Sequence, residues 1–199
     1  MPTTDSIPTF STPASTTGGL VVRRMRDDEA AVAGRLVREA YAGDYDLTDA
    51  YLDEIEAVDE RAREHEVWVA VDAATGDLLG TVTTPRPGRR LSAVARYEDE
   101  LDFRFLGVSS AARGRGVGEV MVRHVLALAA SRGIRRVVLN TGEQMRPARR
   151  LYERMGFERL EDREFTFERP DGTSVHILAY GIDAPGSAGG PAVATGPAA

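Results

Sequence analysis

Three glycines at alternate positions, Gly114, Gly116 and Gly118, follow an apolar run and precede a helical pattern. Two arginines, Arg113 and Arg115, lie among them. Glycine lets a backbone pass close to a bulky anion, and the free N–H groups at a helix N-terminus attract negative charge. This glycine loop is therefore predicted to bind a phosphate or pyrophosphate group.

Two widespread phosphate-binding loops do not fit the spacing. The Walker loop requires Lys and then Ser or Thr after its last glycine, where this chain has Glu119 and Val120. The dinucleotide fingerprint requires G-x-G-x-x-G, whereas the three glycines here are each two residues apart. The pattern that fits is Arg-x-x-Gly-x-Gly, formed by Arg113, Gly116 and Gly118.

A second motif lies downstream, after residues 136–140, which read as a buried strand. It has the form A-x-x-L-Y-x-x-x-G-F and consists of Ala148, Leu151, Tyr152, Gly156 and Phe157. The two motifs, in this order and separated by one predicted helix and one predicted strand, resemble those of the GNAT superfamily of N-acetyltransferases. The resemblance covers residues 20–182 and is specific from residue 102 to residue 157.

The resemblance implies a mixed α/β fold, the GNAT fold, with a central sheet of about seven strands flanked by about four helices. It also implies acetyl-CoA as the acyl donor and no metal. The cofactor-binding positions that it carries over are Leu106, Gly107 and Val108 on the strand before the loop, and Arg113, Gly114, Arg115, Gly116, Val117 and Gly118 in the loop and the first helical turn.

One position departs from the family pattern. The family often has an asparagine three residues before the motif alanine, where it hydrogen-bonds the pantetheine arm, and this chain has Met145 there. We expect Asn140, at the end of the preceding strand, to take a related part in cofactor binding, with Thr141 as the alternative.

Acyl transfer from a thioester to an amine requires a proton for the departing thiolate. In the family, the tyrosine of the second motif commonly supplies it, and that position is Tyr152. A phenol with the usual pKa near 10 carries its proton at neutral pH. Tyr152 also lies on an apolar helical stripe, so packing is its alternative role, and the two roles are compatible.

The general base has more than one candidate. In the histone acetyltransferase branch of the family a glutamate lies six residues before the motif valine, and Asp102 occupies that position before Val108. Aspartate is shorter, so a water would relay the proton. Glu100 is a rival on the same strand face, and an ion pair between Asp102 and Arg104 is the structural alternative.

The loop between the first two predicted helices is expected to bind the acceptor. Asp44, Tyr45 and Asp46 could hold a cationic amine by charge and by an aromatic face. A small-molecule amine and a peptide N-terminus both fit this description. For the acidic segment around this loop as a whole, a solvated helix face is favoured over a wall that attracts amines.

Composition excludes several other functions. The chain has 199 residues and a formal net charge of −6, which predicts one domain and argues against nucleic acid as a partner. It has no cysteine, so a disulfide, a thiolate metal site and a cysteine nucleophile are excluded. His65, His124 and His176 lack the spacing of metal ligands, and His124 is expected in the core.

The two ends differ from the middle of the chain. Residues 1–19 are rich in Ser, Thr and Pro, and residues 184–199 are rich in Gly, Pro and Ala, so both are expected to be disordered around a domain at 20–183. Neither a secretory signal nor a membrane span is visible. We therefore expect a cytoplasmic monomer or homodimer without a membrane partner.

The order of predicted elements agrees with the family fold. Alternation and apolar runs predict strands at 20–24, 67–71, 79–83, 101–108, 136–140, 165–168 and 175–180, and helical spacing predicts helices that begin near 27, 48, 117 and 148.

The resemblance, together with these residues, implies an N-acetyltransferase that transfers an acetyl group from acetyl-CoA to a primary amine by direct attack in a ternary complex. A non-catalytic acyl-CoA-binding sensor or scaffold, and transfer of a longer acyl group, are the alternatives. Turnover would distinguish the sensor from the enzyme.

Overall fold

The computed structural model describes residues 15–169 and 171–186. Its helices are α1 (Ala30–Ala42), α2 (Asp49–Glu56), α3 (Val58–Glu64), α4 (Val117–Ser131) and α5 (Arg146–Arg154). Its strands are β1 (Ser15–Thr17), β2 (Leu20–Arg24), β3 (His65–Asp72), β4 (Leu78–Pro85), β5 (Glu100–Asp102), β6 (Arg104–Val108), β7 (Arg136–Gly142), β8 (Glu158–Arg159), β9 (Phe165–Glu168) and β10 (Ser174–Asp183). None of these helices is long and apolar enough to cross a bilayer.

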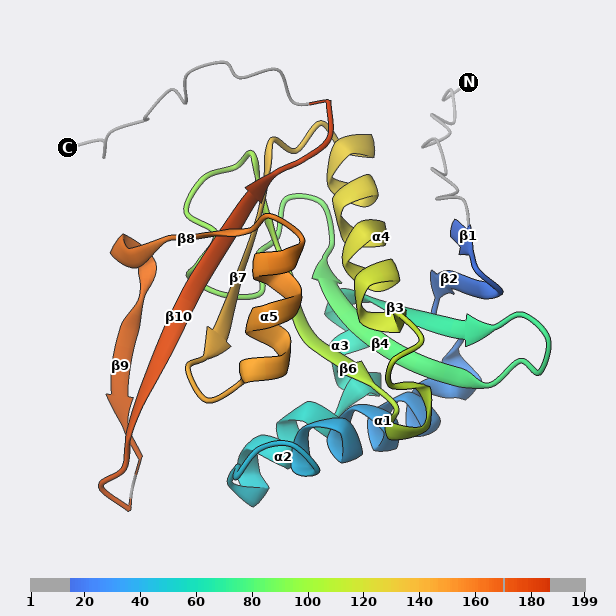
Figure 1. The fold of residues 1–199 in the computed structure, drawn as a ribbon, viewed down its shortest axis with the longest axis horizontal. Coiled ribbons are helices and arrows are strands. Elements are labelled where there is room, and N and C mark those ends of the chain that lie inside the picture. The colour runs from blue at the N-terminus through green and yellow to red at the C-terminus, as the bar shows by residue number, and fades with distance from the viewer. Residues whose placement is uncertain (1–14, 170, 187–199) are drawn as a thin grey trace, which may run out of the picture.

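The strands form two five-stranded sheets rather than the single sheet that the sequence suggested. One sheet has the order β1-β2-β3-β4-β6, and the other has the order β5-β7-β10-β8 with β9 beside β10. Figure 1 shows β7 and β10 on one side of the molecule and β3 and β4 on the other, with α4 and α5 between them in this view. The helices α1 and α2 lie across one end of this arrangement.

The predicted strand at 101–108 is two strands, because the chain changes sheets at Phe103. Asp102 on β5 pairs in parallel with Val138 on β7, whereas Gly107 on β6 pairs antiparallel with Thr81 on β4. Phe105 has a φ of 56°, a left-handed conformation that is costly for a bulky side chain. The change of sheet separates β6 from β7, and two adjoining cavities are lined by residues of both strands.

The helix predicted to begin at Thr48 also divides in two. Thr48 caps α2 as expected, since its hydroxyl accepts a hydrogen bond from the N–H of Tyr51. Ala57 then leaves the helical conformation with a ψ of 58°, and α3 begins at the next residue. The Arg61 guanidinium donates to the carbonyl oxygens of Glu54 and Ile55. It thereby satisfies carbonyl groups at the end of α2 that would otherwise lack a partner.

Part of the expected N-terminal extension is structured. Residues 15–17 pair with 20–22 as a hairpin, and Gly18 and Gly19 both adopt positive φ in its turn. Residues 1–14 and 187–199 lie outside the described residues, so disorder at the two ends stays a prediction.

The core lies mainly between α4 and the two sheets, and it includes His124. The His124 side chain is 3% exposed, and its ring centroid lies 4.4 Å from that of Trp68. Burial lowers the pKa of His124 from 6.5 to about 4. The histidine is therefore a neutral core residue, as its place on the apolar side of the helix predicted.

This burial predicts a specific pH dependence of stability. The unfolded chain binds a proton at His124 near pH 6.5, whereas the folded chain does so only near pH 4. The free energy of unfolding should therefore fall as the pH drops through this window, by up to about 1.4 kcal/mol per pH unit. Denaturant unfolding of the wild type and of His124→Leu at intervals from pH 7 to pH 4 measures the effect. The free energy of unfolding of the wild type minus that of His124→Leu should decrease as the pH falls, because only the wild type has this histidine. Parallel curves of the two free energies against pH would contradict the prediction.

Candidate active site

The glycine loop joins β6 to α4 in a conformation that requires two of its glycines. Gly114 has a φ of 78°, and Gly116 has a φ of 74° and is the residue before the first turn of α4. The N–H of Val120 bonds to the carbonyl of Gly116. The N–H groups of Val117 and Gly118, in the turn before it, have no hydrogen-bond partner within the described residues. Such N–H groups carry partial positive charge and are suited to an anion.

Two other glycines are required by packing instead. A Cβ added to Gly107 would lie 2.9 Å from Cγ2 of Val37, where β6 crosses α1. A Cβ added to Gly118 would lie 3.2 Å from Cδ2 of Leu151, where the start of α4 meets α5. The small residues at these positions therefore bring α1 and α5 close to the loop.

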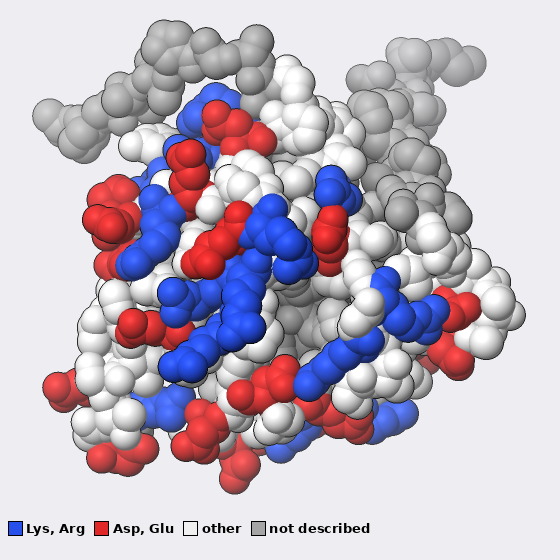
Figure 2. All heavy atoms as spheres, in the orientation of Figure 1, with Lys and Arg blue, Asp and Glu red and all other residues white. Residues whose placement is uncertain are grey.

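Both arginines of the loop form ion pairs. Arg113 Nη2 lies 2.9 Å from a carboxylate oxygen of Asp44, and Arg115 Nη2 lies 2.6 Å from one of Asp72. The hydrogen bond from Arg115 lowers the pKa of Asp72. The arginine side chains are about half exposed, so an incoming anion can reach them. Figure 2 shows further basic side chains gathered where α5 lies, interleaved with acids.

A cavity of about 460 Å³ opens between α1, α2, β6, β7 and the β9–β10 hairpin. Most of its wall is apolar or aromatic, and a few polar side chains point to it from β6 and β7. The lining residues are Tyr41, Leu47, Thr48, Tyr51, Ser92, Arg104, Phe105, Asn140, Thr141, Gly142, Gln144, Met145, Phe165, Phe167, Glu168, Arg169, Val175 and Ile177. Aromatic walls with a few placed polar groups are typical of a small-molecule site.

A second cavity, of about 50 Å³, adjoins the first and extends along β6. Six residues line both cavities: Tyr41, Arg104, Phe105, Asn140, Thr141 and Met145. The narrow cavity is also bounded by Tyr45, Leu106 and Tyr152. It therefore leads from the larger cavity along the strand that precedes the glycine loop.

Tyr152 lies on α5 with its ring in an aromatic cluster. The residue is 5% exposed, and its ring centroid lies 6.0 Å from that of Phe103 and 5.6 Å from that of Phe157. Burial raises the pKa of Tyr152 well above 10, with a smaller contribution from Tyr45. The phenol is therefore a proton donor rather than an anion at neutral pH.

Comparison with known proteins assigns the chain to a family. Residues 30–157 match the model of the acetyltransferase (GNAT) family. This chain belongs to the GNAT family. The match contains both the glycine loop and the second motif, and the family that the motifs suggested is thereby confirmed.

Relatives of this GNAT chain include enzymes named for different acceptors. A mycothiol acetyltransferase of Cellulomonas flavigena is 33% identical over 141 residues, which are 67% of this chain and 40% of the relative. A glucosamine 6-phosphate N-acetyltransferase of rice is 38% identical over 97 residues, which are 47% of this chain and 53% of the relative. This chain thus spans about half or less of each of these two relatives.

Solved structures confirm the GNAT fold. A putative acetyltransferase of Desulfovibrio desulfuricans superposes with a TM-score of 0.63 at 20% identity, covering 83% of this chain and 99% of the other. The ribosomal-protein-S5-alanine acetyltransferase of Vibrio fischeri superposes with a TM-score of 0.65 at 11% identity, covering 89% and 100%. At these identities the likeness concerns the fold alone.

The two base candidates of this GNAT chain are both buried and hydrogen-bonded. The Asp102 carboxylate accepts hydrogen bonds from the N–H of Leu91 at 3.1 Å and from the hydroxyl of Ser92 at 3.0 Å, and burial raises its pKa. Ser92 lines the larger cavity, whereas Asp102 lies behind it. Glu100 forms an ion pair with Arg163 at 2.9 Å, away from both cavities. Asp102 is thus the candidate nearer the site.

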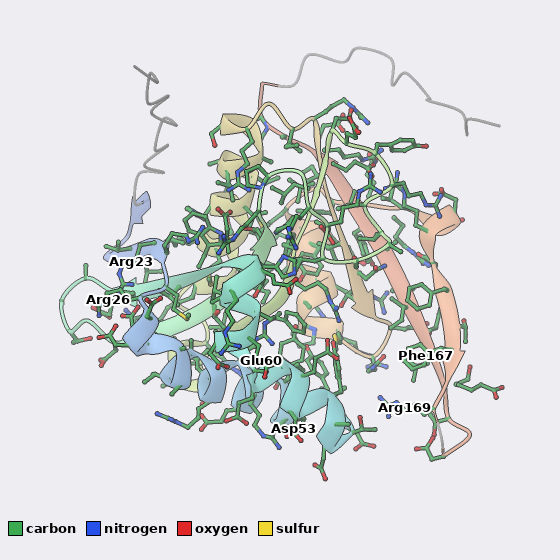
Figure 3. The ribbon with its side chains drawn as sticks, turned by 180° about the vertical axis from the view of Figure 1, so that it is seen from behind. Arg23, Arg26, Asp53, Glu60, Phe167 and Arg169 are labelled. Atoms are coloured by element: carbon green, nitrogen blue, oxygen red, sulfur yellow. The ribbon has the colours of Figure 1, made fainter. Side chains whose placement is uncertain are left out.

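The three predicted acceptor residues lie at the edge of the site rather than around the larger cavity. Asp44 pairs with Arg113, and Tyr45 lines the narrow cavity. All three line a separate, more open hollow, and the carbonyl of Asp46 accepts a hydrogen bond of 3.2 Å from Arg169. Figure 3 shows Arg169 extending from the β9–β10 hairpin toward the α1–α2 side. This contact links the two segments that enclose the larger cavity.

The predicted cofactor positions follow the narrow cavity and the loop. Leu106 lines the narrow cavity, and Val108 lies at the end of β6 beside Gly118. Asn140 lines both cavities, and its side-chain amide donates to the carbonyl of Leu178 at 3.3 Å.

Sequence reasoning missed several residues that line the larger cavity. Phe165 and Phe167 are 51% and 45% exposed on one face of β9, and Tyr51 lies on α2. Two exposed aromatics at alternate positions of a strand were the available signal. Arg104 was considered only as a partner for Asp102, but its guanidinium lies 3.8 Å from Glu54 instead.

Proposed function

We propose that the protein is an acyl-CoA-dependent N-acetyltransferase that transfers an acetyl group from acetyl-CoA to a primary amine. The observation that carries this proposal is the narrow cavity along β6, which connects Tyr152 and Leu106 with the larger cavity. A donor arm in the narrow cavity and an acceptor in the larger one would meet where the two adjoin. Family membership and both motifs support the same activity.

In this proposal the glycine loop holds the donor. The N–H groups of Val117 and Gly118 bind the pyrophosphate, together with the side chains of Arg113 and Arg115. The backbone of Leu106, Gly107 and Val108 runs beside the pantetheine arm, and Asn140 lies across from it. These contacts place the thioester near the junction of the two cavities.

The transfer proceeds by direct attack. The neutral amine nitrogen attacks the thioester carbon, so that a C–N bond forms and the C–S bond breaks. Tyr152 gives its proton to the departing thiolate. The proton of the acceptor ammonium leaves toward Asp102, and because Ser92 lies between Asp102 and the cavity, it passes through the Ser92 hydroxyl or a water.

The size and the largely apolar walls of the larger cavity favour a small-molecule acceptor over a folded protein. Two of the relatives are named for small molecules, mycothiol and glucosamine 6-phosphate, whereas the structural neighbour of Vibrio fischeri is named for an alanine of a ribosomal protein. The volume of about 460 Å³ suits a ligand of a few to about twenty heavy atoms.

Two parallel measurements test the proposed function: calorimetric titration with acetyl-CoA, and release of free thiol with a panel of amines. We expect binding, and thiol release with some of the amines. Binding without release across the panel would identify an acyl-CoA sensor instead. Acetyl label retained on the denatured protein would contradict direct transfer.

The ion pair between Arg113 and Asp44 predicts the effect of a substitution on donor affinity. Asp44→Asn should lower the Kd for acetyl-CoA by about two- to fivefold, because Arg113 no longer has to leave a carboxylate to reach a phosphate. Asp46→Asn, in the same loop, is the matched control and should leave the Kd unchanged. The gain should disappear in the Arg113→Gln background and at high salt. Weaker binding by Asp44→Asn would show that Asp44 orders the loop rather than competing for the arginine.

A further inference from the structure

Arg104 lies at the junction of the two cavities with little to neutralise it. Its side chain is the first of β6, and it lines both the larger and the narrow cavity. The nearest carboxylate oxygen, from Glu54, is 3.8 Å away. The guanidinium carbon lies 4.5 Å from the centroid of the Phe105 ring, which holds the group in place.

A second guanidinium increases the positive charge at this place. Arg61 lies 4.2 Å from the centroid of the same Phe105 ring. Burial lowers the pKa of Arg61 to about 10, with the Glu54 carboxylate opposing the shift and the charge of Arg104 contributing to it. Arg61 donates to helix carbonyls and does not line either cavity. An anion bound to Arg104 would therefore relieve repulsion between the two guanidinium groups.

The walls of the larger cavity carry more positive than negative charge. Arg104 and Arg169 line it, and among its lining residues Glu168 is the one carboxylate. Glu168 lies on exposed β9, away from the junction. An acceptor that carries an anionic group next to its amine fits the charge of these walls better than a polyamine does.

Thr141 supplies a polar group that lacks a partner in the described structure. The residue is 5% exposed, and its buried Oγ1 makes no hydrogen bond with any described group. Thr141 lines both cavities, as Arg104 does. Buried hydroxyls are nearly always satisfied, so an unsatisfied one at a junction of cavities indicates a ligand group. A hydroxyl can accept a hydrogen bond from an amine or ammonium.

The remaining wall is suited to an apolar body. Tyr41 and Tyr51 line one side, and Phe165 and Phe167 line the side of the hairpin. In Figure 3 the labelled Phe167 lies on the hairpin strand. Arg104 and Thr141 both line the junction, so an anion on Arg104 and an amine at Thr141 would be close neighbours in one ligand, with its apolar body extending along this wall.

We propose, on the basis of the function proposed above, that the acceptor is a free α-amino acid with an aromatic or large aliphatic side chain. Arg104 binds its carboxylate, the Thr141 hydroxyl binds its amine, and the aromatic wall receives its side chain. A peptide N-terminus lacks the adjacent carboxylate and is a poor acceptor.

Matched acceptors test this proposal with the full-length protein. L-phenylalanine, L-phenylalaninamide and 2-phenylethylamine share the apolar body and differ at the carboxylate, and L-leucine with 3-methylbutylamine forms a second pair. Thiol release is measured with each, and kcat/KM is expressed per unprotonated amine. We expect each amino acid to exceed its carboxylate-free analogue by about 10- to 100-fold, the usual effect of a charge-assisted hydrogen bond.

Two variants locate the effect. Arg104→Gln should lower kcat/KM for L-phenylalanine by about 10- to 100-fold more than it lowers kcat/KM for 2-phenylethylamine, and so remove most of the preference for the amino acid. Thr141→Val should lower kcat/KM for both acceptors without reducing thermal stability, since it deletes a hydroxyl that no described group satisfies. Arg63 is an exposed arginine of α3, and Arg63→Gln is the matched control, which should leave kcat/KM unchanged for both acceptors.

The outcomes separate this proposal from the proposed function. Thiol release with the carboxylate-free amines that equals or exceeds release with the amino acids would overturn the acceptor assignment and leave the acetyltransferase standing. An equal loss for all acceptors in Arg104→Gln would overturn the role of Arg104. If acetyl-CoA binds but no thiol is released with these acceptors or with the wider panel of amines, the proposed acetyltransferase activity itself is overturned.

Discussion

Replacing Tyr152 with phenylalanine is expected to lower kcat by about 100-fold while leaving the affinity for acetyl-CoA within about twofold. The change keeps the ring, and therefore the packing against Phe103 and Phe157, and removes only the hydroxyl. Burial raises the pKa of this phenol well above 10, so the wild-type rate should also hold its plateau to alkaline pH rather than decline near pH 10.

The control for this substitution is a second tyrosine of the same cluster. The Tyr180 ring lies 6.3 Å from the Tyr152 ring, and its hydroxyl donates to Glu153 at 2.9 Å. Tyr180 lines neither cavity, so Tyr180→Phe should cost about 1 kcal/mol of stability and leave kcat unchanged. If Tyr152→Phe lost acetyl-CoA affinity in proportion to its rate, the residue would be structural and the donor of the proton would lie elsewhere.

Replacing Gly34 with alanine is expected to destabilise the fold by about 3 kcal/mol and to raise KM for the acceptor. Gly34 lies in α1, where a Cβ would be 2.5 Å from the carbonyl oxygen of Glu56 at the end of α2. The obstacle is backbone, so the two helices must move apart. Since Tyr41 on α1 and Tyr51 on α2 both line the larger cavity, the cavity changes shape with them.

Helix propensity makes this a demanding test, because alanine is normally better than glycine inside a helix by about 1 kcal/mol. The reverse substitution Ala31→Gly, at an exposed position of the same helix, should cost no more than this and leave KM unchanged. Denaturant unfolding and steady-state kinetics on both variants measure the effect. A more stable Gly34→Ala variant would mean that the close contact between α1 and α2 does not constrain the site.

The parts of the site that sequence alone predicted are those set by local backbone chemistry. The loop at Gly114 and Gly116 needs positive φ, which glycine adopts at little cost, and the helix after it begins where the glycines end. The stripe that contains Tyr152 has a helical period that any fold must bury. Both features act over a few residues, so the family followed from them without knowledge of the tertiary structure.

The acceptor side of the molecule depends on contacts between distant segments. Asp44 has the chemistry of an amine-binding residue, yet the fold places Arg113 beside it. Arg104 looked like the partner of its near neighbour Asp102, but the change of sheet at Phe103 turns the two residues toward different surroundings. An apolar strand has the same alternation whichever sheet it joins, so this change left no periodic signal.

The sequence by itself determined the family, the conformation of the glycine loop and the helical position of Tyr152, because glycine conformation and helical periodicity are local properties. Only the tertiary structure decided which side chains line the larger cavity. The cavity walls come from α1, α2, β6, β7 and the β9–β10 hairpin, and their meeting depends on packing across the whole chain. The weak pairing of Arg104 and the unsatisfied hydroxyl of Thr141 depend on which distant segments surround these residues, so they can be recognised only in the assembled structure.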